Sequence, residues 1–484
     1  MNGNLRGKTV SGVLWGFLEK FSLQAFGFIQ GIILARLLAP SDYGLIAMTG
    51  IFTGLAYTLV DSGFSSALIQ KKDKTEMDYS TTFITNVLLS FLICVVLWAC
   101  SGLIAEFYHE AILKPIIETL AVLLLATSLV TIQDVRMTAR LQFKQKSIVN
   151  VVTTISSGLL AIIMAFAGFG VWSLVYPTFL TIILKFILYW RYQHWFPQLQ
   201  FSIKSCKTLF GFGSKILASS ILATIFENIY PIVIGRKYSA KDLGYYSRGS
   251  SYSIMPSKTI TSIIETVAYP VLSELQDDRE AMLAAFRRML RTSAFIIFPI
   301  MAWLFALAKP LVIVMISSKW LPCVIFLQLL CLANMWWHVH VLNLTLLKAM
   351  GRSDLFFVLE VVKKIVAVII LIITVPLGII FMCYGSIFSA LISVCINSFY
   401  TGKLMNFGIF KQLKDMTPSF LYSACMGICG YFASTLFTSN WVQVIVGSLA
   451  CVVCYFGLAY MTGSADLNYI TILIMDKYQG WHKA

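Results

Sequence analysis

The sequence is poor in charge. Only 12% of its 484 residues are Asp, Glu, Lys or Arg, about half the share of an average soluble domain. The acidic residues number 22 and the histidines 5. This shortage excludes an ordinary soluble enzyme or binding domain, because a single soluble core does not grow large enough to bury so apolar a chain.

Further absences narrow the function. GFGSK at 211–215 lacks the spacing of a phosphate-binding loop, and the 11 cysteines fall almost entirely inside apolar runs, without the pattern of a disulfide framework or a zinc site. No long loop rich in acids is present, which argues against a membrane glycosyltransferase or polymerase, the enzymatic alternative. We therefore expect no catalytic residues, no metal and no cofactor.

What the sequence does contain is apolar sequence in long blocks. Hydrophobic residues make up 58% of the chain, and a helix needs about 20 of them in succession to cross a bilayer. These blocks predict an all-α membrane protein with about fourteen spans. They lie near residues 11–35, 45–69, 83–105, 115–133, 148–168, 172–190, 216–235, 249–271, 293–316, 321–347, 365–381, 385–402, 419–437 and 441–461.

The basic residues predict the topology. The chain has 37 Lys and Arg and a net charge of +15, and most of the basic residues fall in loops that share one side if the N-terminus is cytoplasmic. Such a bias marks the cytoplasmic side, so we expect both termini in the cytoplasm and the protein in a bacterial inner membrane. Because the charges are spread loop by loop, we expect no nucleic-acid partner.

An internal repeat organises the chain. Ile32–Met48 (IILARLLAPSDYGLIAM) aligns with Ile232–Arg248 (IVIGRKYSAKDLGYYSR) at a constant offset of 200 residues. The alignment matches an Arg, an Asp and a Gly, namely Arg36 with Arg236, Asp42 with Asp242 and Gly44 with Gly244. In both copies the segment closes a first span and leads into a second.

The repeat predicts an architecture. Each copy carries six spans, an even number, so the copies are parallel and related by a pseudo-two-fold axis along the membrane normal. We expect a six-helix bundle at 1–200, a second at 201–405, and two additional spans with a tail at 406–484. A substrate cavity would lie between the bundles.

The first seventy residues resemble a known family. The stretch from Val13 to Asp73, and ARLLAPSDYGL above all, is similar to the polysaccharide transporters of the multidrug/oligosaccharidyl-lipid/polysaccharide exporter superfamily, in the Wzx-type and colanic- or teichuronic-acid exporter-like branch. The resemblance implies a flippase that works by alternating access and moves a polyprenyl-diphosphate-linked oligosaccharide from the cytoplasmic to the outer leaflet. It also implies membrane lipids, a polysaccharide polymerase and assembly proteins as partners. A drug or cation antiporter of the same superfamily is the alternative in transport.

Ionisable residues inside spans are the candidates for the site, since each costs about 2.5–3.5 kcal/mol to insert. We expect Lys20, Gln24 and Lys258 to bind the anionic headgroup, because a diphosphate needs basic partners. The acids expected to line the cavity or to carry protons are Glu19, Asp61, Glu227 and Glu265. The competing interpretation, that polar and small residues join neighbouring helices, remains open for the Gly and Ser positions.

Overall fold

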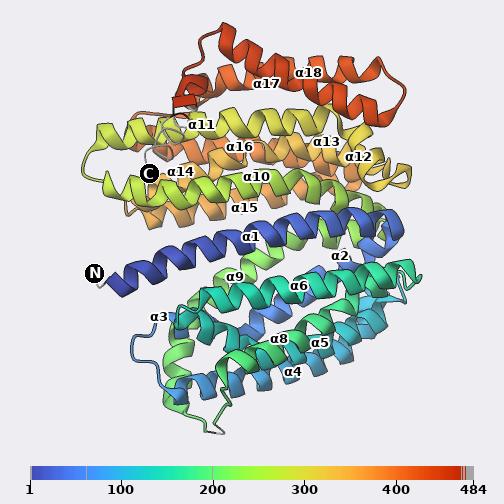
Figure 1. Cartoon of the computed structure of the whole chain (residues 1–484), viewed down its shortest axis with the longest axis vertical. Coiled ribbons are helices and arrows are strands. Elements are labelled where there is room, and N and C mark those ends of the chain that lie inside the picture. The colour runs from blue at the N-terminus through green and yellow to red at the C-terminus, as the bar shows by residue number, and fades with distance from the viewer. Residues whose placement is uncertain (1–2, 62, 199, 470, 473–474, 476–484) are drawn as a thin grey trace. The chain divides into compact units, whose positions relative to one another are not determined.

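The computed structural model describes residues 3–61, 63–198, 200–469, 471–472 and 475. All regular structure in this part of the chain is helical (Figure 1). Ten helical segments are long and apolar enough to cross a membrane, which confirms the predicted all-α, multi-pass membrane class. The remaining predicted spans fall on the helices at 3–37, 240–274, 353–374 and 409–435, and the count of about fourteen stays a prediction.

The chain forms two compact units, Met1–Gly244 and Tyr245–Ala484. The helices of the first are α1 (Gly3–Leu37), α2 (Pro40–Asp61), α3 (Phe64–Gln70), α4 (Glu76–Tyr108), α5 (Leu113–Ala139), α6 (Phe143–Phe166), α7 (Trp172–Val175), α8 (Pro177–Gln193) and α9 (Ile203–Lys237). Within it α1 packs against α6, α4 against α5 and α2 against α9. Because α9 packs on α2, the first unit extends beyond residue 200, and the predicted six-helix partition stays a prediction.

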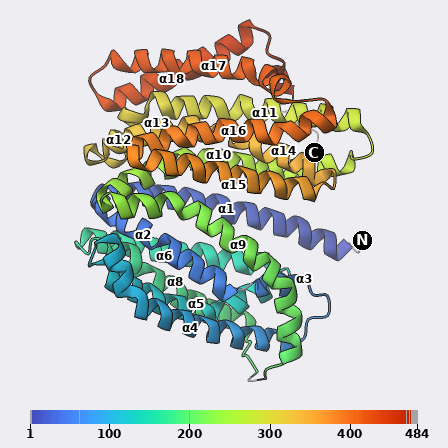
Figure 2. The ribbon, with the colours of Figure 1, turned by 180° about the vertical axis from the view of Figure 1, so that it is seen from behind.

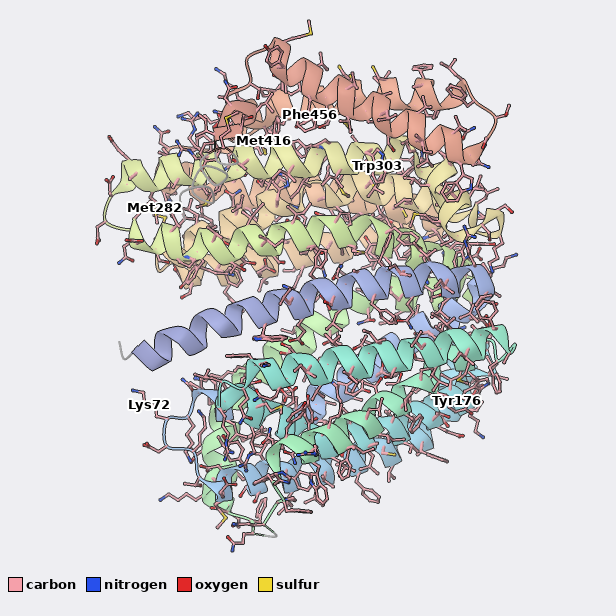
Figure 3. All side chains as sticks on the ribbon, viewed as in Figure 1. Lys72, Tyr176, Met282, Trp303, Met416 and Phe456 are labelled. Atoms are coloured by element: carbon pink, nitrogen blue, oxygen red, sulfur yellow. The ribbon has the colours of Figure 1, made fainter. Side chains whose placement is uncertain are left out.

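The second unit holds most of α10 (Ala240–Glu274) and all later helices. These are α11 (Arg279–Ala306), α12 (Ala308–Ile316), α13 (Cys323–Asn334), α14 (Trp337–Ala349), α15 (Ser353–Thr374), α16 (Ile379–Met405), α17 (Ile409–Thr435) and α18 (Asn440–Met461). α17 lies beside α18 in both views (Figure 2) and packs on α11. Trp303 of α11, labelled in Figure 3, donates its indole N–H to Ser448 of α18 at 2.9 Å.

The helix boundaries reproduce the repeat. α1 and α9 each have 35 residues and begin at Gly3 and Ile203, and α2 and α10 begin at Pro40 and Ala240. All four boundaries keep the offset of 200 residues found in the sequence. The copies then diverge, because α2 ends at Asp61 whereas α10 continues without a break to Glu274.

Candidate transport site

Lys20 and Gln24 lie one turn apart on α1, and both are exposed. Glu19 is directed elsewhere: its carboxylate accepts hydrogen bonds from Ser147 Oγ at 2.6 Å and from Asn150 Nδ2 at 2.7 Å, both on α6. Adjacent helix residues do not share a face, so the contact of Glu19 with α6 leaves Lys20 directed away from it. Glu19 therefore fixes the rotation of α1 and presents the Lys20–Gln24 face.

Asp61 is the last residue of α2, where the helix chain breaks before α3. Its carboxylate accepts a hydrogen bond from Ser65 of α3. Gly63 adopts φ 70°, and a Cβ there would come within 2.4 Å of the Gly213 carbonyl oxygen of α9. Only glycine combines this left-handed backbone with so close an approach, so Asp61 sits at a break that α9 holds in place.

The polar residues in the middle of α9 point in two directions. Thr224 and Asn228 face α2, where Gly54 and Gly50 leave room for them, and Thr58 Oγ1 lies 3.3 Å from Thr224 Oγ1. This is the small-residue packing expected between helices in a membrane. Glu227, next to Asn228, is exposed.

Lys258 and Glu265 of α10 are both placed against α14. The Lys258 ammonium lies 5.5 Å from the centre of the Trp337 ring and the side chain is exposed. Two turns further, Lys348 Nζ is 3.3 Å from Glu265 Oε1, with about two fifths of each side chain exposed. At this exposure the ion pair contributes about 0–1 kcal/mol, so it orients Glu265 more than it stabilises the fold.

The predicted residues are thus divided between the two units. Five of them belong to the first unit, namely Glu19, Lys20, Gln24, Asp61 and Glu227. The other two, Lys258 and Glu265, belong to the second unit. Sequence reasoning missed Lys348, the partner of Glu265, because 83 residues separate the two and no local pattern connects them.

Three groups of polar contacts in the first unit, fully or partly buried, were also missed, because their basic members were interpreted only as topology signals. Asp78, with no exposed surface, binds Lys71 Nζ at 2.7 Å and Ser205 Oγ at 2.7 Å. Arg136 pairs with Glu76 at 2.7 Å and lies over the Trp195 ring. Asp134 receives hydrogen bonds from Lys146 at 2.7 Å and from Tyr189 at 2.6 Å. These ion pairs and hydrogen bonds join the end of α3 to α4 and link α4, α5, α6, α8 and α9.

The second unit buries a neutral network instead. Asn343 of α14 and Gln412 of α17 exchange two hydrogen bonds of 3.0 Å. Thr401 of α16 donates to Asn343 Oδ1 at 2.7 Å, and Ser398 donates to Gln412 Oε1 at 3.1 Å. All four side chains are fully buried, so the network joins three helices in a fixed register.

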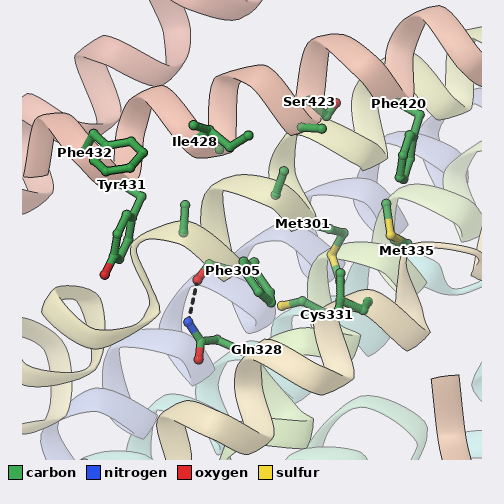
Figure 4. A pocket seen from close by; sticks show the side chains of 15 residues that line it. Met301, Phe305, Gln328, Cys331, Met335, Phe420, Ser423, Ile428, Tyr431 and Phe432 are labelled. Carbon is green, nitrogen blue, oxygen red and sulfur yellow. Dashed lines mark hydrogen bonds between the residues drawn. The ribbon is translucent and has the colours of Figure 1, made fainter. Parts of the chain in front are cut away.

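A pocket of about 420 Å³ opens between α11, α13 and α17 (Figure 4). Its walls are mainly aliphatic and aromatic, among them Met301, Phe305 and Phe420. Its polar side chains include Gln328, which donates to the Phe305 carbonyl at 3.1 Å (dashed in Figure 4). Such a lining suits a hydrocarbon chain rather than a charged headgroup.

The matched residues of the repeat meet at a close crossing of α2 and α10. A Cβ on Gly44 would come within 1.6 Å of the Ala240 carbonyl oxygen, and a Cβ on Gly244 within 1.8 Å of the Pro40 carbonyl oxygen. Residue 44 of one copy touches residue 240 of the other, and residue 244 touches residue 40, which is the reciprocity that a two-fold axis requires. Backbones approach this closely only where glycine removes the side chain.

The matched aspartates cap the two crossing helices. Asp42 accepts a hydrogen bond from the Ala39 backbone N–H at 2.9 Å. Asp242 accepts one from Ser239 Oγ at 2.6 Å, and Ser239 Oγ accepts the Asp242 backbone N–H at 3.1 Å. Arg236 contacts His109 and lies over Phe107 at 5.2 Å. The matched Asp is therefore explained by its role at the start of a helix, and the matched Gly by the close backbone crossing.

Comparison with known proteins identifies the family. Residues 33–325 match the family described as "Polysaccharide biosynthesis protein", which is more than half of the chain. The chain belongs to this family. It is 25% identical over 456 residues to the teichuronic acid biosynthesis protein TuaB of Bacillus subtilis (strain 168), covering 93% of this chain and 94% of that protein.

Other relatives agree. The lipopolysaccharide biosynthesis protein WzxC of Escherichia coli (strain K12) is 25% identical over 370 residues, 74% of each chain. Among solved structures, the lipid II flippase MurJ in an inward closed conformation has a TM-score of 0.76 at 16% identity, over 93% of this chain and 98% of that one. An inward-facing multidrug MATE transporter of the MOP superfamily has a TM-score of 0.59 at 12% identity, over 79% and 96%. The chain has the MurJ/MATE fold.

Proposed function

We propose that the protein is a flippase that moves a polyprenyl-diphosphate-linked oligosaccharide from the cytoplasmic to the outer leaflet for surface polysaccharide synthesis. The observation that carries this proposal is membership of a polysaccharide biosynthesis family combined with a fold that matches a lipid II flippase over nearly the whole chain. The succinoglycan biosynthesis transport protein ExoT of Rhizobium meliloti (strain 1021), 24% identical over 324 residues, is also a relative named for transport. The chain is accordingly a transporter rather than an enzyme.

We assign the anionic headgroup to Lys20, Gln24 and Lys258. Their exposure supports this assignment, because an unburied lysine within a membrane helix is costly unless water or an anion reaches it. Glu19 would orient the first lysine through α6, and Trp337 would hold the second. A drug or cation antiporter would instead need a net acidic cavity.

We also propose that transport is coupled to protons, with Glu19, Asp61, Glu227 and Glu265 as the acids that line the cavity. Asp61 is the sharpest of these to test, since it lies at the break between α2 and α3. Asp61→Asn keeps the shape and the bond to Ser65 but removes the charge. Transport by this variant should lose its response to an imposed pH difference, and an unchanged response would remove Asp61 from the coupling scheme.

Two further elements fit the proposal. Alternating access requires a contact that closes one side, and the reciprocal Gly44–Gly244 crossing supplies a close backbone approach for it. The apolar pocket between α11, α13 and α17 offers a place for part of the polyprenyl chain. Oligosaccharide and lipid would then be held by different parts of the protein.

The proposed setting is a bacterial inner membrane, with both termini cytoplasmic and a polysaccharide polymerase and assembly proteins as partners. Reporter fusions after Lys72 and after Ser464 should both report the cytoplasm, because the loops on that side hold most of the basic residues. A signal from outside the membrane at either position would contradict this topology.

The experiment for the site uses cells that depend on this protein for surface polysaccharide. Lys20→Ala and Lys258→Ala should cause lipid-linked oligosaccharide to accumulate on the cytoplasmic leaflet at normal protein levels. Lys114→Ala, an exposed lysine in the first turns of α5, serves as the matched control and should export normally. Normal export by both site variants would make Lys20 and Lys258 structural.

A further inference from the structure

The second unit contains a buried polar layer whose groups have no partners. His338 of α14 has no exposed surface, and neither of its ring nitrogens makes a hydrogen bond. The Met335 carbonyl lies near the ring but not at hydrogen-bonding geometry. Asn397 of α16 is equally buried, and both its amide oxygen and its amide nitrogen lack partners.

The register of the helices places His338 and Asn397 at one level. Short connections at 350–352 and 375–378 make α14 and α15, and then α15 and α16, antiparallel, so α14 and α16 run in the same direction. The hydrogen bond between Thr401 and Asn343 aligns them. One turn earlier on both helices come Asn397 and Val339, so His338, which precedes Val339, lies at the level of Asn397 but on a neighbouring face of α14.

The layer one turn later shows what is unusual here. Asn343, Thr401, Ser398 and Gln412 satisfy one another completely, although they lie on the same packed helices. An unpaired buried polar group is unfavourable, and in native proteins it generally marks bound water, an ion or a functional role. Two unpaired buried side chains at one level, next to a complete network, therefore indicate a binding site.

The chain is also broken at this level. α13 ends at Asn334 and α14 begins at Trp337, near the middle of one span, Cys323–Ala349. Ser257 of α10 donates to the Asn334 carbonyl at 2.7 Å, and Asn334 Nδ2 donates to Ser253 Oγ at 2.9 Å. Interrupted helices near the middle of a membrane are typical places for coupling-ion sites in transporters.

The chemistry of the layer selects its ligand. Imidazole and amide groups both donate and accept hydrogen bonds, and no cluster of potential metal ligands occurs in the described residues. Phe298 of α11 packs against the imidazole at a ring distance of 5.3 Å. The titratable groups on the surrounding elements include His340 on α14, Lys258 on α10, Cys331 on α13, Lys363 on α15, Cys395 on α16 and Tyr422 on α17. The carboxylates on these elements include Glu360 of α15, which pairs with Lys363, and Glu265 of α10, which pairs with Lys348.

We propose that His338 is a coupling-proton site of the transporter, with Asn397 as the acceptor that holds the protonated ring. The proposal rests on the transport function proposed above. In this buried layer a charged imidazole without a partner would be costly, so proton uptake belongs to a more open conformation. When the helices separate and water enters, a ring nitrogen takes up one proton and Asn397 Oδ1 accepts the resulting N–H. The proton binds the hydrated conformation better and so shifts the population toward it.

The test uses the purified protein in vesicles with a fluorescent polyprenyl-diphosphate oligosaccharide and an imposed pH difference. Wild type should flip the lipid at a rate that responds to the gradient, whereas His338→Gln should flip it without any response. His194→Gln, an exposed histidine at the end of α8, is the control and should respond as wild type does. A normal response in His338→Gln, or no response in wild type, would overturn the proposal.

A second measurement separates this proposal from the proposed function. Nitrogen-15 NMR of labelled histidines in nanodiscs follows the resonance that disappears in both His338→Gln and His338→Asn. It should move with pH between about 5 and 8, where histidine ordinarily titrates, and Asn397→Leu should shift its midpoint to lower pH. If wild type flips no lipid, the transport function fails while the titration still decides the site, and a resonance that does not move overturns the site.

Discussion

The two copies of the repeat are alike where the first helix turns into the second and different beyond that point. In both, an Asp caps the second helix and a Gly allows the backbones to cross. Beyond the turn, α2 ends at Asp61, just before Gly63, while α10 continues and carries Lys258 and Glu265. At the offset of 200 these lysine and glutamate positions correspond to Thr58 and Ser65. The turn between the two helices is therefore the symmetric part of the repeat, whereas the ionisable residues in the helix interiors differ between the copies.

The difference teaches where an asymmetric ligand can be recognised. Lys20 of α1 corresponds to Ser220 of α9, just as Lys258 of α10 corresponds to Thr58 of α2. If both lysines bind the headgroup as proposed, each copy contributes one of them from a different helix. A lipid-linked oligosaccharide has no symmetry, and a site with basic residues at non-equivalent positions fits such a ligand better than two identical half-sites would.

The largest effect should come from breaking the shared turn. Gly44→Val and Gly244→Val each place side-chain atoms where a carbonyl oxygen already lies, so the crossing cannot form. We expect both proteins to insert in the membrane and both to lose transport to background. The measurement is lipid flipping in vesicles.

Gly102→Val on α4 is the control for these variants, since a Cβ there meets no atom within 4 Å. It should transport normally. If Gly44→Val abolishes transport while Gly244→Val leaves it unchanged, the crossing is not reciprocal in function and the symmetric interpretation is wrong.

A smaller effect should distinguish two aspartates that are 200 residues apart. Asp78 has no exposed surface and binds Lys71 and Ser205, whereas Asp278 is exposed and caps α11 through two backbone N–H groups. Asp78→Ala should lower the free energy of unfolding by about 3 kcal/mol, because buried charge-assisted bonds are lost. Asp278→Ala should cost about 1 kcal/mol, the usual value of a helix cap.

Denaturant unfolding in detergent measures both aspartate variants, with Asp73→Ala, an exposed charge in the same loop as Lys71, as the neutral reference. Equal losses for Asp78→Ala and Asp278→Ala would show that burial does not separate these positions.

The smallest effect sharpens the likeness of the copies. Asp42→Ala and Asp242→Ala both remove a cap from the first turn of a long helix. Each should destabilise the protein by about 1 kcal/mol, and the two values should agree within about 0.5 kcal/mol. Thermal unfolding of the two variants side by side measures this, and a loss confined to one of them would mean that the matched aspartates differ in role.

Much of the fold could be predicted because a membrane helix is encoded by a continuous run of apolar residues. Apolar blocks located the helices, and three matched residues were enough to find a repeat that the helix boundaries reproduce. The break after Asp61 was missed, because Gly63 is required there only by its contact with Gly213, 150 residues away. Local sequence contains no sign of that contact.

The site was harder to predict for a related reason. Sequence identified Glu19 and Lys20 as a charged pair in α1 but could not assign their faces, which depend on Ser147 and Asn150 of α6. The neutral network around Asn343 and Gln412 joins helices 69 residues apart. Long-range polar contacts have no periodic signature, so they became visible only in the structure.

The most direct test of the flippase proposal uses the purified protein in vesicles that contain a fluorescent polyprenyl-diphosphate oligosaccharide in both leaflets. A membrane-impermeant quencher added outside reaches only the outer leaflet unless lipid crosses. We predict that vesicles with the wild-type protein lose nearly all fluorescence, while vesicles with Lys20→Ala or Lys258→Ala retain the inner-leaflet share. If wild-type vesicles retain as much fluorescence as protein-free vesicles, the protein does not flip this lipid and the proposed function is wrong.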